Sequence, residues 1–161
     1  MMADEDTCFS CGINERPDLP PRERIYVGPG WRVAHAFGTA LPGWLVLLPR
    51  RHVTALDELT AAEAEELGPL LRAVTRALRE TTGCDKTYVA LVAETEGFAH
   101  AHFHVVPRHG DLDPGLRGPR VFDLLGAGPD RSVPDAAMDE IALRIAAALT
   151  ERPETTGRPG T

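Results

Sequence analysis

The first third of the chain alternates short apolar runs with turn residues, a pattern typical of strands. Residues 24–27 and 31–37 fit two short strands, and residues 28–30 (Gly-Pro-Gly) between them favour a tight turn. A continuous apolar run over residues 44–48 follows and stops at Pro49. Because a run without polar positions suits a strand buried on both faces, it predicts a central strand of the sheet.

Two later segments carry apolar residues at helical spacing. The first, residues 60–82, begins with Thr60 and Glu63 in a capping-box pattern and ends at Gly83. Its apolar residues recur three or four positions apart: Leu67, Leu70, Leu71, Val74 and Leu78. Pro134 opens a second helix, which bears Met138, Ile141, Ile145 and Leu149. Both helices are predicted to bury one face.

Residues 86–93 and 101–106 read as two more strands joined by a short loop. Helices and strands do not alternate regularly, so the strands are expected to pair antiparallel. The prediction is an α+β fold, with an antiparallel sheet of about five strands covered by one long helix plus a C-terminal helix. We expect one domain over residues 1–150 and a disordered tail over 151–161.

Composition narrows the functional classes. The 161 residues suit one domain with its own core, and the formal net charge of -7 does not indicate a general nucleic-acid binder. A local site can still oppose that charge and take a small anion. No stretch approaches the roughly 18 apolar residues of a membrane span, and the acidic start MMADEDTC does not resemble a secretory signal. With three cysteines, a cytoplasmic protein with reduced thiols is predicted.

The most informative segment contains His100, His102 and His104, half of the six histidines in the chain. On a strand, alternate residues share a face, so the three imidazoles are predicted to project together, roughly 7 Å apart. The residues between them would turn toward the core: Ala101, Phe103 and Val105. Mutual repulsion and partial burial favour at least one neutral imidazole near pH 7, free to act as a nucleophile or a ligand.

Residues 100–106 (HAHFHVV), running on into Pro107-Arg108, resemble the motif of the histidine-triad (HIT) family. The order of elements is also similar, because an apolar strand led by Pro42-Gly43 ends in PRRH at residues 49–52, and a capped helix follows. The resemblance covers about residues 8–110. It implies a HIT-like fold, a homodimer, and a nucleotide hydrolase or transferase that acts at the α-phosphate.

The resemblance also implies residue roles. His102 would be the nucleophile and form a nucleotidyl-histidine intermediate, and His104 would bind phosphate oxygens or hold the reactive tautomer of His102. The substrate would be a nucleotide, such as a dinucleoside polyphosphate or a nucleoside phosphoramidate. Backbone amides from Gly97 to Ala99 and the side chain of Arg108 are further candidates for phosphate binding, although Arg108 fits a solvated strand end equally well.

Cys8 and Cys11 form a C-x2-C motif in a polar segment, residues 1–23, that needs an external tie to be ordered. This spacing lets both sulfurs reach one tetrahedral ion. A redox pair is the alternative, but that motif is expected at the head of a helix in a βαβ unit.

Some HIT proteins with an N-terminal C-x2-C bind zinc, and the resemblance implies His52 and His100 as the other two ligands here. A structural Zn2+ would then tie the N-terminal segment to the sheet, against the alternative of free thiols with a surface His52. With His100 as a ligand, the working pair would be His102 and His104.

Several positions differ from the family pattern. Trp44 stands where many HIT enzymes have an additional histidine, residues 94–99 lack the usual Gly-Gln-Ser, and the ribose-binding acid is replaced near Ala36. These differences leave open a second hypothesis, a zinc-stabilised HIT-fold module that binds a nucleotide or protein with weak or no catalysis. A metal-dependent hydrolase would need an open coordination position, and four ligands favour a structural ion.

The remaining chemically interesting residues receive no catalytic role. Trp44 fits a core position in its apolar strand better than a base-stacking one. His35 and His109 are expected on the surface, and Cys84 as a small buried apolar residue.

Overall fold

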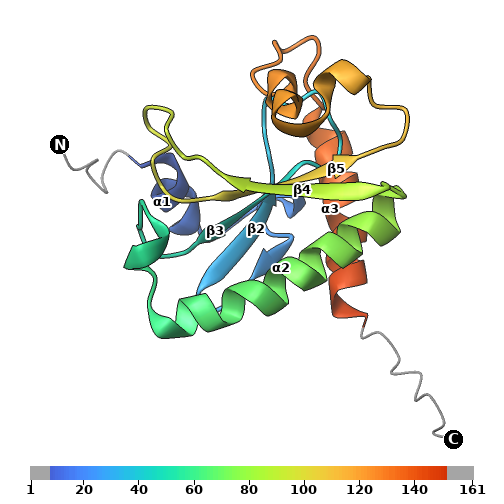
Figure 1. Cartoon of the computed structure of the whole chain (residues 1–161). Coiled ribbons are helices and arrows are strands. Elements are labelled where there is room, and N and C mark those ends of the chain that lie inside the picture. Colours follow the sequence, from blue (N-terminus) through green and yellow to red (C-terminus); the bar gives the residue numbers. More distant parts are fainter. Residues whose placement is uncertain (1–7, 152–161) are drawn as a thin grey trace, which may run out of the picture.

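The structure, a computed structural model, describes residues 8–151 (Figure 1). The acidic N-terminal residues and nearly all of the predicted tail, 152–161, lie outside the described residues. No helix in the described part combines the length and the apolar character that crossing a membrane requires.

The sheet has five strands in the order β1-β2-β3-β5-β4, and every neighbouring pair is antiparallel. The strands are β1 (Tyr26–Val27), β2 (Trp31–His35), β3 (Leu45–Pro49), β4 (Lys86–Leu91) and β5 (Phe103–Arg108). The apolar run predicted as a central strand is β3, which lies in the middle of the sheet. The predicted α+β architecture, an antiparallel sheet of about five strands with one long helix and a C-terminal helix, is confirmed.

Two helices cover one face of the sheet (Figure 1). The long helix α2 (Ala61–Thr82) contacts β4 and β5, and α3 (Asp135–Thr150) packs against α2. The capping box is present, and Gly83 ends α2 in the left-handed region at φ 70°. The core between the helices and the sheet includes Trp31, Val33, Leu45, Leu47, Val74, Leu78, Val105 and Ile145. Burial of these side chains is the main stabilising force of the fold.

The opposite face of the sheet carries shorter elements. These are the helix α1 (Phe9–Asn14) and two 3-10 helices, Pro114–Leu116 and Gly118–Leu124. A second, smaller core packs there around four buried residues, Ala36, Trp44, Val106 and Val121. This face, which no long helix covers, contains the cavity that His102 and His104 line.

The histidine segment differs from its predicted strand in one respect. β5 begins at Phe103, two residues later than expected, because the preceding backbone bonds to a loop instead of a neighbouring strand. The amide of Ala101 donates to the carbonyl of Val53 at 2.8 Å. Of the three triad histidines, only His104 therefore lies within the regular strand. His100 lies outside it, so its side chain need not point to the same face as that of His104.

Candidate active site and metal centre

Four potential metal ligands come together from three parts of the chain. Cys8 caps the N-terminus of α1 and Cys11 lies within it, His52 follows β3, and His100 precedes β5. Their ligand atoms all lie within 4.8 Å of one another. These are the four residues that the sequence analysis grouped as a candidate metal site.

The distances in this cluster fit a tetrahedral ion. Nδ1 of His100 lies 3.5 Å from Sγ of Cys8 and 3.6 Å from Sγ of Cys11, and Nδ1 of His52 lies 3.3 Å from Sγ of Cys11. Bond lengths of about 2.3 Å to sulfur and 2.0 Å to nitrogen, at tetrahedral angles, place sulfur and nitrogen roughly 3.5 Å apart. Two sulfurs and two nitrogens are also the donor set that zinc favours.

The ring of His100 is held in the tautomer that a metal ligand needs. Its Nε2 lies 2.8 Å from the carbonyl oxygen of Pro49, which can only accept a hydrogen bond. Nε2 therefore carries the hydrogen, and Nδ1, which faces the sulfurs, keeps its lone pair. The ring is completely buried, and burial lowers the pKa of His100 to about 4.

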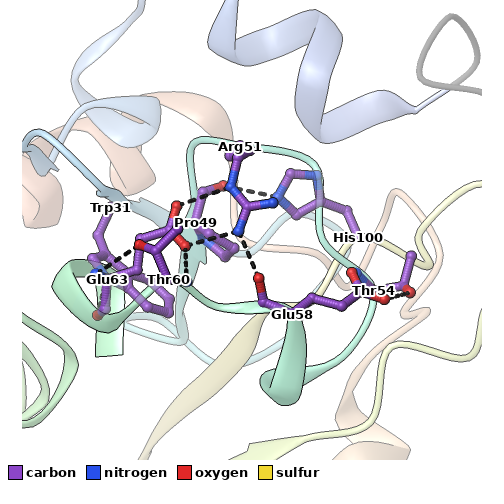
Figure 2. A network of polar contacts seen from close by, with 8 residues as sticks. All are labelled: Trp31, Pro49, Arg51, Thr54, Glu58, Thr60, Glu63 and His100. Atoms are coloured by element: carbon purple, nitrogen blue, oxygen red, sulfur yellow. Dashed lines mark hydrogen bonds and ion pairs between the residues drawn. The ribbon is translucent and has the colours of Figure 1, made fainter. Parts of the chain in front are cut away.

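The loop that bears His52 is anchored to the start of α2. Figure 2 shows Arg51 donating to both the carbonyl oxygen of Glu58 and the carboxylate of Glu63, at 2.7 and 2.9 Å. The same carboxylate completes the capping box by accepting from the amide of Thr60. The Glu63 side chain therefore joins the cap of α2 to Arg51, which lies in the segment between Pro49 and His52.

His102 and His104 form a directly hydrogen-bonded pair, with their Nε2 atoms 3.1 Å apart. The indole of Trp44 donates to Nδ1 of His104 at 3.1 Å, so the hydrogen of a neutral His104 is on Nε2. Nδ1 of His102 donates to the carbonyl of His100 at 2.8 Å, which leaves a lone pair on Nε2. His104 therefore donates to the nitrogen of His102 that is available as a nucleophile.

His104 stays neutral near pH 7 because it is buried. Burial, with a smaller contribution from the charge of His102, lowers the pKa of His104 to about 4. The edges of Trp44 and Phe122 approach the ring, with centroid distances of 5.8 and 5.0 Å. Trp44 is thus fully buried, as predicted for a core residue, but it also fixes the protonation of a site residue.

The prediction that His35 lies on the surface is wrong. The side chain is 2% exposed, its Nδ1 donates to the carbonyl of Ala36, and its Nε2 accepts from the amide of Gly43. Burial lowers the pKa of His35. The residue braces the turn that leads into Trp44, whereas His109 is half-buried and does not line the cavity.

A cavity of about 530 Å³ opens beside His102 and His104. Side chains of the central strands form its apolar floor: Ala34, Val46 and Leu48. Three aromatic rings from separate segments stand together at its wall, with centroids 5.2 to 5.8 Å apart: Phe9, Phe37 and Phe98. Such a cavity suits a flat ring system joined to a polar group near the histidines.

The other predicted phosphate ligands, Gly97, Ala99 and Arg108, are not among the residues that line the cavity. Gly97 and Ala99 flank Phe98, but of these three only Phe98 lines the cavity. Arg108 lies at the far end of β5, where it pairs with Asp85 at 3.2 Å, and it is not among the lining residues. The structure therefore separates Arg108 from the two histidines.

Sequence reasoning missed the aromatic wall of the cavity and also two charged residues that line it, Arg32 and Glu23. Arg32 is the single arginine in β2 and stands between the apolar residues Trp31 and Val33, a signal that the sequence contains. Glu23 has no such signal, because only the folding of the segment before β1 brings it to the cavity.

The HIT domain model matches residues 21–111. No curated protein matches the chain. Several solved structures resemble it at low sequence identity. A zinc-bound histidine triad family protein from Mycobacterium smegmatis is 20% identical with a TM-score of 0.64, and the match covers 91% of this chain and 95% of that one.

Two further solved structures resemble this chain to a similar degree. A HIT-like protein involved in cell-cycle regulation from Bartonella henselae, solved with an unknown ligand, is 19% identical with a TM-score of 0.65, covering 90% and 98% of the two chains. A hypothetical histidine triad nucleotide-binding protein from Sulfolobus tokodaii is 14% identical with a TM-score of 0.66, covering 88% and 91%.

These structures establish the likeness of fold, and the family model spans more than half of the chain. It includes His52 and all three triad histidines, whereas Cys8 and Cys11 precede the matched residues. By this match, and by the fold that carries it, the chain belongs to the HIT domain family.

Proposed function

We propose that this protein is a nucleotide hydrolase or transferase that acts at the α-phosphate of a nucleotide conjugate. The observation that supports it best is the hydrogen-bonded pair of His102 and His104 beside an apolar cavity. The contact of His102 with the carbonyl of His100 leaves Nε2 without a hydrogen, so its lone pair, which accepts from His104, can attack once that hydrogen bond breaks. Neutral imidazole is a competent nucleophile near pH 7.

In the proposed reaction, Nε2 of His102 attacks phosphorus and forms a P–N bond, and the leaving group departs with the electrons of its former bond to phosphorus. His104 then no longer donates to His102, and its N–H becomes available to a phosphate oxygen. In a second step the oxygen of water or another acceptor bonds to phosphorus and gives up its proton to solvent, and the P–N bond breaks with its electron pair returning to Nε2 of His102. This sequence replaces one difficult displacement with two easier ones.

The cavity accommodates the nucleoside in this proposal. Its apolar floor and aromatic wall would pack against the base, and His104 would bind the phosphate together with backbone amides between Gly97 and Ala99. Arg108, which pairs with Asp85 away from the cavity, is left out of this role. Glu94 also lines the cavity, and its negative charge would disfavour a nearby phosphate.

The Glu94 carboxylate favours a second candidate function, a binding module with weak or no catalysis. It would hold a nucleotide or a protein partner through the same cavity. The two candidates differ in turnover and share the binding step.

For the metal site we propose a structural Zn2+ held by Cys8, Cys11, His52 and His100. The geometry of the donor set supports it, and a similar fold from Mycobacterium smegmatis is zinc-bound. Four protein ligands complete a tetrahedral shell, so an ion there would link α1 to the sheet and supply no reactive position.

We further propose a homodimer in which the β4 edges of two copies meet. β4 ends the sheet, and it carries the exposed apolar residues Val89 and, just beyond it, Val92. An exposed apolar sheet edge is a surface that proteins usually cover.

A panel of adenine and guanine nucleotide conjugates labelled at the α-phosphate tests the catalytic function. Wild type should release labelled product, His102→Ala should not, and the control His109→Ala, which removes a histidine outside the cavity, should match wild type. A labelled adduct trapped on His102 would identify the intermediate. Nucleotide binding without turnover in wild type would favour the binding module. Neither binding nor turnover would reject the enzyme and the nucleotide-binding form of the module.

A further inference from the structure

A nearly buried ion pair lies in the wall of the cavity that His102 and His104 line. Nη1 of Arg32 contacts Oε2 of Glu23 at 2.8 Å and also donates to the carbonyl oxygen of Glu23 at 2.9 Å. Nε of Arg32 donates to Oδ1 of Asn14 at 2.7 Å. The side chains are only 4% and 17% exposed, and both residues line the cavity that holds His102 and His104.

Each member of this pair has one side-chain atom that no described residue contacts by a hydrogen bond or ion pair. Within the described residues, Nη2 of Arg32 and Oε1 of Glu23 make no hydrogen bond or ion pair. Yet no side-chain nitrogen or oxygen of that part of the chain is both fully buried and unpaired. These two atoms therefore keep contact with open space, where one can donate to a ligand and the other can accept from it.

The surrounding structure holds the pair in place. Glu23 ends a 3-10 helix, Pro21–Glu23, whose middle residue Arg22 is tied to α3. The amide and the guanidinium of Arg22 both donate to the carboxylate of Asp139, at 2.9 and 2.8 Å. A donor and an acceptor that are fixed before binding lose little entropy when a ligand arrives.

Strand register sets the distance from the pair to the histidines. Arg32 lies opposite Leu48 across β2 and β3, and Leu47 lies opposite Phe103, which directly follows His102. Arg32 and His102 are therefore separated by two strand spacings, about 10 Å at roughly 4.8 Å each. The apolar floor of the cavity lies between them.

This arrangement matches the layout of a nucleotide. If the α-phosphorus lies at His102, the base lies one sugar away, over the apolar floor and toward the ion pair. A phosphate is a poor ligand for the pair itself, because the Glu23 carboxylate would repel it beside Arg32. A neutral ring with an acceptor next to an N–H group is complementary to both unpaired atoms.

We propose that Arg32 and Glu23 recognise the polar edge of the nucleobase and thereby determine base specificity. Nη2 of Arg32 donates to a ring nitrogen or carbonyl of the base, and Oε1 of Glu23 accepts from its N–H group. The inference rests on the proposed function, since it takes the cavity as the nucleoside site.

Calorimetric binding of AMP, GMP and ribose 5-phosphate to the full chain tests this proposal. Glu23→Gln exchanges a pure acceptor for an amide that can also donate, so it should weaken at least one nucleotide by about tenfold and change the AMP-to-GMP affinity ratio. Ribose 5-phosphate, which lacks a base, should bind as to wild type. Arg24→Gln is the matched control, because Arg24 lines a neighbouring cavity but not this one.

The alternative is that the pair only holds α1 in place through Asn14. In that case the variant would weaken all three ligands equally, and the inference would be overturned, as it would be if the variant bound both nucleotides like wild type. Thermal melting verifies folding, and if Glu23→Gln does not fold, Arg32→Lys, which keeps the charge but loses the planar fork, carries the same comparison. If wild type binds neither nucleotide, the proposed function itself fails.

Discussion

The indole N–H of Trp44 donates to Nδ1 of His104 across 3.1 Å in a fully buried contact. Trp44 occupies a position where the resemblance to HIT enzymes leads one to expect a histidine. Because the indole can only donate, it fixes the hydrogen of neutral His104 on Nε2, which faces His102. Trp44 thus places an indole N–H where a histidine is expected, and this N–H imposes a defined tautomer on His104.

Trp44→Phe tests this relationship by removing the donor while keeping an aromatic ring. His104 should lose its fixed tautomer, and turnover should fall roughly 10–100-fold, as for other changes behind a functional ligand. Nδ1 of His104 would be buried without a partner, so the free energy of unfolding should fall by about 1–3 kcal/mol. Nitrogen chemical shifts of the imidazoles report the tautomer directly.

The matched control is Trp31→Phe, since Nε1 of Trp31 donates to the carbonyl of Glu63 in the other core. It should cost similar stability and leave the imidazole shifts of His104 unchanged. Equal shifts in the two variants would show that Trp44 does not set the tautomer.

Two buried histidines outside the metal cluster, His35 and His104, should make the stability of the protein depend on pH. Burial lowers the pKa of His35 and lowers that of His104 to about 4, whereas an unfolded histidine titrates near 6.5. Between these values the unfolded state binds more protons, so the stability is fully present above pH 6.5 and is lost as the pH falls toward 4. His104 alone accounts for up to roughly 2 kcal/mol between pH 7 and pH 5.

Urea unfolding at pH 7 and pH 5 checks this sign. Wild type should be less stable at pH 5, and His104→Gln, which cannot titrate, should lose less over the same interval. Any contribution from the metal cluster is common to both proteins and cancels in the comparison. An equal loss in the two proteins would contradict the assigned role of His104.

Local sequence signals predicted the elements that depend on neighbouring residues. The reciprocal bonds of Thr60 and Glu63 start α2 at the expected residue, and Gly83 ends it in the left-handed conformation that glycine adopts readily. The apolar run that became β3 was equally clear. The contacts that start and end α2 join residues no more than four positions apart, and the assignment of β3 follows from side-chain polarity alone.

Contacts between distant segments could not be predicted in this way. His35 is polar and was expected on the surface, yet it braces a turn eight residues away. β5 starts late because Ala101 bonds to Val53. For the site, residue types and family resemblance grouped the four metal-ligand candidates, but the Arg32–Glu23 pair depends on how the segment before β1 packs against α3.

Removal of the proposed metal should release α1 from the sheet. Chelation should make the thiols of Cys8 and Cys11 reactive and lower the melting temperature by about 10 °C, because the ion stabilises only the folded arrangement. Thiol titration and thermal melting with and without chelator measure both effects, and metal analysis identifies the ion.

Two cysteine variants sharpen this test. Cys11→Ser should melt like chelated wild type and respond little to chelator. Cys84→Ala removes a buried cysteine outside the cluster and should keep the full chelator response. A Cys11→Ser protein that retains the wild-type response would rule out the proposed ligand set.

The proposed dimer predicts different effects at the two edges of the sheet. Val89→Lys places a charge on the β4 edge and should shift the protein from dimer to monomer in light scattering after gel filtration. Val27→Lys is the matched control, since Val27 is similarly exposed on β1 at the other edge. A monomeric wild type, or equal behaviour of both variants, would contradict dimerisation through β4.

Gly43 lies where the turn before Trp44 packs against the helical layer, and a side chain there should destabilise the fold. Its φ is +83°, and an added Cβ would lie 3.2 to 3.3 Å from three side chains, those of Thr82, Ile141 and Leu78. Gly43→Ala should therefore add steric crowding to the backbone strain of roughly 1 kcal/mol that a left-handed alanine costs. Gly38→Ala is the control, because Gly38 has φ +64° but open space around it, so it should show the strain alone. Denaturant unfolding should give a larger loss for Gly43→Ala, and imidazole shifts should report a disturbed His104 only in that variant, because only Gly43 directly precedes Trp44.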